Sequence, residues 1–238
     1  MKEGGQILAA ILKQLVAAAK PGLTTESLDK LAAELISSHK AKASFLGYEG
    51  FPASICTSIN EEIVHGLPSD RKLITGDVLK IDVGIYYKGY HTDTAATVIV
   101  GGDDDKEKNK LVNVTNEALR IGISKAKAGN TIGDIGAAIQ NFVEANGFNV
   151  IRDLVGHGIG KDLHEEPQVL NYGPAGEGEI LKPGMVICIE PMVVTGSHEI
   201  GESEDGHTYV TADGGLAAQS EHTVAITDDK PLILTLNS

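Results

Sequence analysis

Two stretches of the chain repeat one pattern: residues 73–82 read LITGDVLKID, and residues 181–190 read LKPGMVICIE. Each begins with leucine, turns at a glycine and continues as an apolar run typical of a β-strand. Each then ends on a carboxylate, Asp82 in the first copy and Glu190 in the second. The matching order predicts that the two segments occupy corresponding places in two related units.

A second pair of segments recurs at nearly the same separation, KPGLT at 20–24 and KAGNT at 127–131, and an amphipathic helical pattern follows each. The sequence therefore predicts a single domain over residues 1–238, built from two α+β halves of roughly 1–105 and 106–238. Two related halves commonly enclose a cleft between them. The alternative is a chance similarity between common helix-turn-strand patterns.

Hydrophobic periodicity places the secondary structure. Helical patterns cover 5–19, 24–39, 105–127 and 131–146, and strand-like runs cover 55–59, 78–87, 90–100, 185–195 and 220–227. Thr24 and Thr131 can cap the helices that follow them, and Thr131 with Asp134 has the spacing of a capping box. Long helices with antiparallel hairpins indicate an α+β fold rather than a doubly wound parallel sheet.

Composition excludes several classes of function. The 238 residues are 42% hydrophobic and 22% charged, as in globular proteins with a full core. The net charge of −13 disfavours phosphate backbones and anionic membranes, so neither direct nucleic-acid binding nor a membrane partner is predicted. Cys56 and Cys188 form no C-x-x-C pair and indicate buried free thiols in a reducing compartment. The N-terminal apolar stretch is helical rather than signal-like, so a cytoplasmic location is expected.

Two aspartates stand almost symmetrically about the predicted turn at Lys88-Gly89. Asp82 and Asp93 should therefore lie across one hairpin from each other, within about one register step. Like charges in that position destabilise a sheet, and the neighbouring residues are apolar. A shared proton, a buried Arg or Lys, or a bound cation could neutralise them.

Two glutamates in the second half favour the cation. Glu190 ends one apolar run and Glu221 begins another, and Lys80 is the only basic residue next to any of the four carboxylates. Two divalent ions would supply the missing positive charge. Taken singly, each carboxylate has the alternative of a helix cap or a salt bridge.

Residues 156–167, GHGIGKDLHEEP, add two imidazoles. The pattern is neither the phosphate-binding G-x-G-x-x-G nor the zinc-binding H-E-x-x-H. Glycines around His157 allow the backbone to approach closely, and we expect His157 to be a fifth ligand with His164 nearby. Carboxylate and imidazole ligands without thiolate suit Mn, Fe, Co or Zn.

These segments, together with SIN at 58–60, His65-Gly66 and QSEHT at 219–223, closely resemble the methionine aminopeptidases of the short type I form. The resemblance runs over nearly the whole chain. It implies the pita-bread fold, in which two pseudo-symmetric α+β halves carry antiparallel sheet inside and helices outside. It also implies removal of the initiator methionine from nascent proteins, with preference for a small second residue.

The resemblance assigns the metal ligands. It makes Asp82 a bidentate ligand of one of two metal ions, Asp93 and Glu221 the bridging ligands, and His157 and Glu190 the ligands of the other ion. A hydroxide shared by the ions would attack the scissile carbonyl.

The resemblance also assigns the groups that act on the substrate. Glu190 would relay the proton, while His65 and His164 would contact the substrate and assist the leaving amine and the oxyanion. The methionine pocket maps onto Phe45, Tyr48, Phe51, Cys56, His65, Leu163 and His207. Phe51, Leu163 and His207 replace the Tyr, Phe and Trp often found there, and Phe45 replaces a small residue. For Phe45, Tyr48 and Phe51, ordinary core packing is the alternative.

Other functions remain open from the sequence. An Xaa-Pro aminopeptidase or dipeptidase shares this fold and the five ligands, although such relatives generally carry an additional N-terminal domain. A metal-free binding module of the same fold is a second alternative, and the five filled ligand positions argue against it. The resemblance implies the N-terminal methionine of nascent polypeptides as partner, transient ribosome association and a monomer.

Overall fold

The computed structural model describes residues 1–236, so Asn237 and Ser238 of the predicted domain lie outside the described part. Its helices are α1 (Lys2–Ala18), α2 (Thr25–Ser38), the 3-10 helix η1 (Tyr48–Gly50), α3 (Lys106–Lys125) and α4 (Ile132–Ala145). The four α-helices confirm the predicted ranges to within a few residues. Thr24 caps α2 by accepting from the Ser27 N–H, and Thr131 forms the predicted capping box with Asp134 at the start of α4.

The sheet of the first half is antiparallel throughout. It consists of β1 (Lys42–Ala43), β2 (Cys56–Ile59), β4 (Val78–Tyr87) and β5 (Tyr90–Ile99), with β4 paired to the other three. Lys88 and Gly89 form the predicted tight turn between β4 and β5, with φ angles of 50° and 92°. Positive φ at both turn residues matches the right-handed twist of a hairpin.

The second half carries a corresponding sheet in the order β15-β14-β9-β7-β8. Its strands are β7 (Gly156–Gly158), β8 (Glu165–Val169), β9 (Val186–Ile189), β14 (His222–Ala225) and β15 (Leu232–Ile233). A smaller sheet is formed by β6 (Asn149–Val150), β10 (Met192–Val194) and β13 (Ala217–Gln219).

The predicted single strand 185–195 is wrong. The chain leaves one sheet after Ile189 and enters another at Met192, so that β9 and β10 are separate strands. Pro191 lies between them, and a proline has no N–H with which to continue a ladder. The break leaves Glu190 at the end of β9 rather than within a strand.

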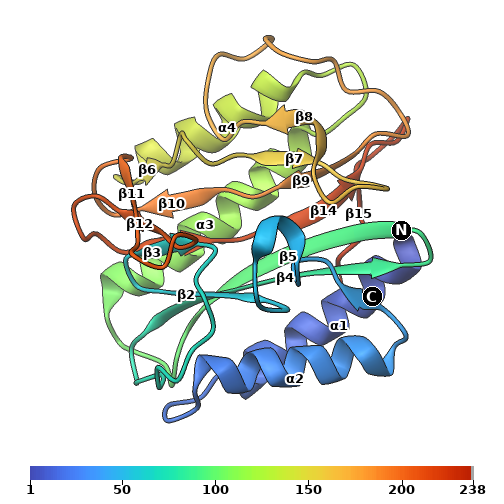
Figure 1. Cartoon of the computed structure of the whole chain (residues 1–238). Coiled ribbons are helices and arrows are strands. Elements are labelled where there is room, and N and C mark those ends of the chain that lie inside the picture. Colours follow the sequence, from blue (N-terminus) through green and yellow to red (C-terminus); the bar gives the residue numbers. More distant parts are fainter. Residues whose placement is uncertain (237–238) are drawn as a thin grey trace.

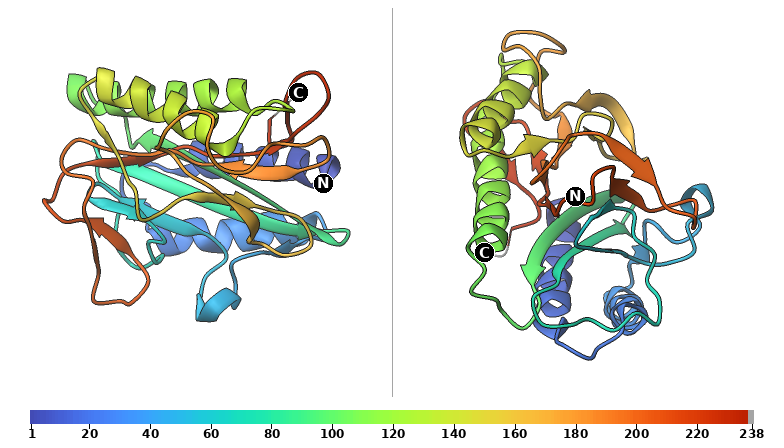
Figure 2. Two further views of the ribbon diagram at one scale, coloured as in Figure 1. Left: turned by 90° about the horizontal axis from the view of Figure 1, so that it is seen from above. Right: turned by 90° about the vertical axis from the view of Figure 1, so that its left-hand side faces the viewer.

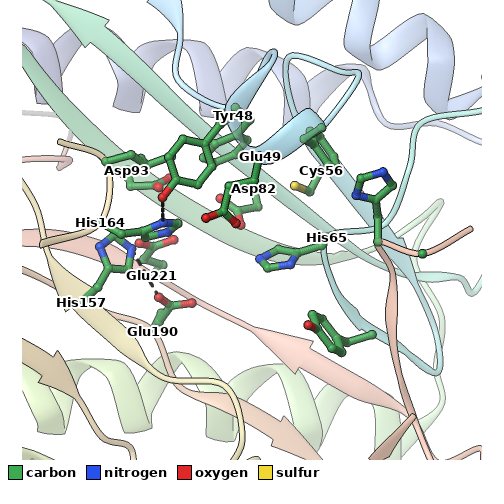
Figure 3. Close-up of a pocket in the computed structure, with 16 residues that line it drawn as sticks. Tyr48, Glu49, Cys56, His65, Asp82, Asp93, His157, His164, Glu190 and Glu221 are labelled. Carbon is green, nitrogen blue, oxygen red and sulfur yellow. Dashed lines mark hydrogen bonds and ion pairs between the residues drawn. The ribbon is translucent and has the colours of Figure 1, made fainter. Parts of the chain in front are cut away.

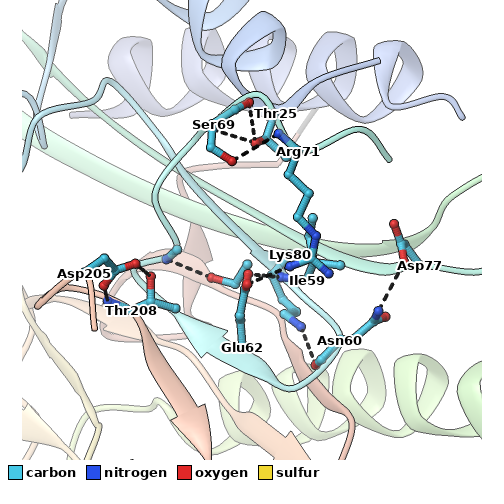
Figure 4. Close-up of polar contacts among 12 residues, drawn as sticks. Thr25, Ile59, Asn60, Glu62, Ser69, Arg71, Asp77, Lys80, Asp205 and Thr208 are labelled. Atoms are coloured by element: carbon cyan, nitrogen blue, oxygen red, sulfur yellow. Dashed lines mark hydrogen bonds and ion pairs between the residues drawn. The ribbon is translucent and has the colours of Figure 1, made fainter. Parts of the chain in front are cut away.

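A second small sheet joins the halves. In it β12 (Tyr209–Thr211) of the second half pairs with β3 (Glu62–Val64) of the first half and with β11 (Ile200–Glu202). Nearby, the buried Lys80 ammonium donates to the carbonyl oxygens of Asn60 (2.9 Å), Val78 (3.3 Å) and Ala217 (3.0 Å). Lys80, on β4, thereby links both halves; Figure 4 shows it beside Asn60.

Each half has its own apolar core. Buried residues of α1, α2 and β4 form one cluster, and buried residues of α3, α4, β9 and β14 form another. The two helix pairs lie on the outside with the strands between them, as Figures 1 and 2 show. This arrangement of two α+β units with antiparallel sheets confirms the predicted fold class. Within residues 1–236, the helices are too short or too polar to cross a bilayer.

Candidate active site

Both halves contribute to one cavity of about 300 Å³. Every residue predicted to belong to the site lines it: Phe45, Tyr48, Phe51, Cys56, His65, Asp82, Asp93, His157, Leu163, His164, Glu190, His207 and Glu221. Figure 3 shows the carboxylates and imidazoles that it labels converging. Glu49, Gly206 and Tyr209 also line it and were missed by the sequence analysis. Glu49 is the neighbour of Tyr48 on η1, and that adjacency was the signal available for finding it.

The hairpin places the two aspartates on the same face of the sheet. Asp82 lies opposite Ala95 and Asp93 lies opposite Gly84, so the two are offset by two residues. The expected offset of one step is wrong, because the pairing is centred on Lys88-Gly89, one residue beyond the midpoint of the aspartates. An offset of two keeps both carboxylates on one face as diagonal neighbours.

Glu221 joins the aspartates from the other half. One carboxylate oxygen from each of Asp82, Asp93 and Glu221 lies within 4.8 Å of the others. Hydrogen bonds between the halves fix this approach: the Glu221 N–H donates to the Ala95 carbonyl (3.0 Å), and the Thr94 hydroxyl donates to the Glu221 carbonyl (2.8 Å). The three carboxylates are therefore held together by the backbone rather than by flexible side chains.

Glu190 and His157 complete the group. Nε2 of His157 lies 3.7 Å from Oε1 of Glu190. Nδ1 of His157 lies 2.8 Å from the Gly158 carbonyl oxygen, which can only accept, so Nδ1 carries the proton and Nε2 presents a lone pair. A side chain at Gly158 would collide with the Glu166 carbonyl, which explains the glycine beside this histidine.

The carboxylates are in an environment that opposes their ionisation. Burial raises the pKa of Asp93 to about 7, and burial with the nearby Asp93 charge raises that of Glu190 to about 8. Burial and the neighbouring carboxylates raise the pKa values of Asp82 and Glu221 well above their ordinary range. Four acidic groups in one dry site therefore need positive charge to stay ionised together.

No basic side chain within residues 1–236 supplies that charge. None of the four carboxylates forms an ion pair with Lys or Arg, and Lys80 is bound instead by three carbonyls. Oδ1 of Asp82 and Oε1 of Glu221 are buried without a hydrogen-bond partner in the described chain. Converging lone pairs on oxygen and on a neutral imidazole fit divalent cations.

Burial favours the neutral form of His65, His157 and His164 by lowering the pKa of each. Burial lowers the pKa of His157 to about 4, and it lowers that of His65 to about 4 with help from the nearby His164 and His207. Nδ1 of His164 lies 2.8 Å from the Tyr48 hydroxyl, and the His164 ring meets the His157 ring edge-on at 4.3 Å. The imidazoles can therefore act as ligands and as hydrogen-bonding groups rather than as charges.

The remaining wall of the cavity is mostly apolar. Phe45, Phe51, Cys56 and Leu163 are buried in one cluster, and the Phe51 ring contacts the His207 ring at 5.6 Å. Phe45 and Phe51 were expected either to line a pocket or to pack in the core, and both descriptions hold, because the two side chains pack in the cluster and also line the cavity. Cys56 and Cys188 are free and buried, as predicted.

A mixed α+β fold with buried carboxylates and an imidazole at the junction of its halves defines a class of metal-dependent hydrolases. The chain belongs to metallopeptidase family M24, whose sequence model matches residues 1–228. It is 48% identical to a methionine aminopeptidase of Clostridium acetobutylicum over 237 residues, which is 99% of this chain and 94% of that protein. It is 43% identical to the methionine aminopeptidase of Escherichia coli over 238 residues, covering 99% of this chain and 90% of that protein.

Solved structures agree on the fold. A methionine aminopeptidase from Thermotoga maritima superposes with a TM-score of 0.96 at 44% identity, covering 99% of this chain and 94% of that one. A prolidase from Pyrococcus horikoshii superposes with a TM-score of 0.79 at 21% identity. The superposition includes 100% of this chain and 61% of the prolidase chain. At that identity the prolidase shows only the shared pita-bread architecture.

Proposed function

We propose that this protein is a metal-dependent aminopeptidase that removes the N-terminal methionine of polypeptides and prefers a small second residue. One observation carries the proposal: a single cavity holds five potential metal-ligating side chains next to an apolar wall. The high identity to proteins named methionine aminopeptidase supports the same activity. The catalytic unit is a single domain over residues 1–238, built from halves 1–105 and 106–238.

Five side chains would hold two divalent ions, Co, Mn, Fe or Zn. These five side chains are those of Asp82, Asp93, His157, Glu190 and Glu221. When bound, the ions supply Lewis acidity and lower the pKa of water. Support comes from the buried unpaired oxygens of Asp82 and Glu221 and from the lone pair on Nε2 of His157.

Glu190 is proposed as the group that moves the proton. Without metal, burial and Asp93 raise its pKa to about 8. The positive charge of bound ions would keep the carboxylate ionised and able to accept a proton. It would accept a proton from the attacking water at a carboxylate oxygen and pass that proton to the leaving amine. His157 Nε2, 3.7 Å from Oε1, lies on one side of this carboxylate.

His65 and His164 are proposed to position the scissile amide. Both line the cavity, and the lowered pKa of His65, about 4 because of burial, keeps its ring neutral. A neutral imidazole can donate to a developing oxyanion or to the peptide without introducing a charge. The Tyr48 hydroxyl, 2.8 Å from Nδ1 of His164, fixes the orientation of that ring.

The apolar wall would take the methionine side chain. Phe45, Phe51, Cys56, Leu163 and His207 line it, and a cavity of about 300 Å³ is of the size that holds a small ligand. In the cell we propose a cytoplasmic monomer that meets nascent chains and associates transiently with ribosomes. Co-sedimentation of the protein with translating ribosomes tests the last point.

Peptide hydrolysis tests the activity. We expect the protein loaded with Mn²⁺ or Co²⁺ to cleave Met-Ala-Xaa at least about tenfold faster than Met-Leu-Xaa, because a close-fitting cleft rejects bulk. An Xaa-Pro peptide should not be cleaved, and Asp93→Asn should remove most of the activity. Equal rates on the two methionyl peptides would contradict the size preference, and cleavage of Xaa-Pro alone would assign the chain to the prolidase type.

A further inference from the structure

We propose that Gln219 is a positioning residue, which holds the Glu190 carboxylate in position for divalent metal beside Asp82, the carboxylate at the corresponding place in the other half. The inference rests on the metal site proposed above. It concerns a neutral residue that lines neither the apolar wall nor the cavity itself.

The first observation is the contact. The Gln219 side chain is buried, with the residue 1% exposed, and its Nε2 donates to Oε2 of Glu190 at 3.3 Å. The Gln219 side chain also opposes the rise in the pKa of the nearby Asp82, which burial and the Asp93 and Glu190 charges cause. The amide thus bonds to the carboxylate of one half and lies near that of the other.

The second observation is that the carbonyl oxygen of this amide lacks a hydrogen-bond partner among the described residues. Ionised carboxylates only accept hydrogen bonds, so the NH₂ group of Gln219 must face them. Oε1 is then buried without a hydrogen-bond partner among the described residues. A buried unsatisfied acceptor costs about 1–3 kcal/mol, a penalty that a methionine of similar size would avoid. The amide is therefore explained by the carboxylates it faces and not by packing.

The backbone of Gln219 is clamped to the strands that carry the ligands. Its N–H donates to the Thr97 hydroxyl at 2.9 Å, and that hydroxyl donates to its carbonyl at 2.6 Å. Thr97 lies on β5 with Asp93. Gln219, on β13, pairs with Met192 of β10, which is two residues beyond Glu190. The amide is therefore held at a fixed place relative to both halves.

A neutral donor suits this position. A lysine or arginine between Asp82 and Glu190 would neutralise their repulsion, but it would also repel a divalent cation. An amide N–H stabilises ionised carboxylates and fixes their rotamers without adding net charge. Such outer groups typically contribute 10–100-fold to metal affinity.

Metal binding by itself, without turnover, tests the inference. We expect Gln219→Met to weaken binding of Mn²⁺ to the chelator-treated protein by about 10–100-fold in calorimetric titration. Gln219→Asn should weaken it similarly, because the shorter side chain withdraws the amide by about 1.5 Å. The second variant keeps the test valid if the first fails to fold.

Asn171 provides a matched control. It is fully buried, its Nδ2 donates to Glu190 at 3.1 Å, and its Oδ1 also lacks a partner within residues 1–236. Its bond, however, goes to the main-chain carbonyl of Glu190 and not to the carboxylate. We expect Asn171→Leu to change the Mn²⁺ affinity by less than about threefold while it destabilises the fold to a similar degree.

Three results distinguish the possibilities. Weaker binding in both Gln219 variants but not in Asn171→Leu supports the positioning role. Unchanged binding in Gln219→Met, or equal losses in all three variants, overturns it while leaving the metal site intact. If the unaltered protein binds no Mn²⁺, Co²⁺, Fe²⁺ or Zn²⁺, the proposed metal site itself is wrong.

Discussion

Removing divalent metal should make the stability of this protein fall as the pH rises above neutrality. The reason lies in Glu190, whose pKa is raised from 4.5 to about 8 by burial and by Asp93. An acid whose pKa is higher in the folded state binds a proton that the unfolded chain has released. The folded state therefore loses stability as pH rises from about 4 until the group ionises near 8.

The useful window is pH 6.5 to 8. Burial lowers the pKa values of His65, His157 and His222 to about 4, so these groups give the opposite slope, but only up to their unfolded pKa of about 6.5. Above it, Glu190 by itself spans about 1.5 pH units at about 1.4 kcal/mol per unit, and the raised pKa values of Asp82, Asp93 and Glu221 add losses of the same sign. The expected loss from Glu190 is thus about 2 kcal/mol.

Urea unfolding followed by circular dichroism measures this effect, since the chain has no tryptophan to report by fluorescence. The matched variant is Glu190→Gln, which keeps the shape and removes the titration. Burial lowers the pKa of Lys80 to about 7, which makes both proteins more stable as the pH rises above 7. Subtracting the free energy of unfolding of Glu190→Gln from that of the unaltered protein cancels this shared rise. With EDTA present, the free energy of unfolding of the unaltered protein should fall by about 2 kcal/mol relative to Glu190→Gln between pH 6.5 and 8.

Saturating Mn²⁺ should abolish that fall, because ligands bind metal in their ionised form and metal stabilises the folded state increasingly as pH rises. A metal-free protein whose stability relative to Glu190→Gln stays flat or rises over this window would refute the account of the buried carboxylates.

Three further outcomes are expected. Thr131→Ala removes the bond from the Asp134 N–H to the Thr131 hydroxyl, one of the two bonds of the capping box, and should lower the free energy of unfolding by about 1 kcal/mol, measured in urea. Lys80→Met removes a charged donor from three buried carbonyls, two of which, those of Asn60 and Val78, keep a backbone N–H donor, and should lower it by about 2–3 kcal/mol, seen as a fall in melting temperature. Glu49→Gln should lower the pKa of His164 further, because burial lowers that pKa and the Glu49 charge opposes the shift; an NMR titration in which it rises would contradict this.

The helices and the metal-ligating residues could be predicted because each leaves a local signal. A 3.6-residue period with a threonine cap identifies α2 and α4, and a carboxylate at the end of an apolar run identifies Asp82 and Glu190. Pro191 carried a signal too, the missing N–H that ends β9, and it was overlooked in the apolar run.

Other parts leave no such signal. β3 and β12 are three residues long and pair across most of the chain, so no period reveals them. Gln219 is neutral, and its importance depends on what its amide faces after folding. Sequence can identify a residue whose chemistry is conspicuous, but it cannot identify one whose role comes only from a tertiary contact.

The pairing of β12 with β3 has a consequence for dividing the molecule. Because β3 of the first half adds to the β11–β12 pair of the second, a cut near residue 105 would leave the facing edges of β3 and β12 without their partners. We expect each fragment to aggregate or stay unfolded alone, and the two to recover structure on mixing. This dependence of each half on the other makes the protein a candidate for split-fragment complementation.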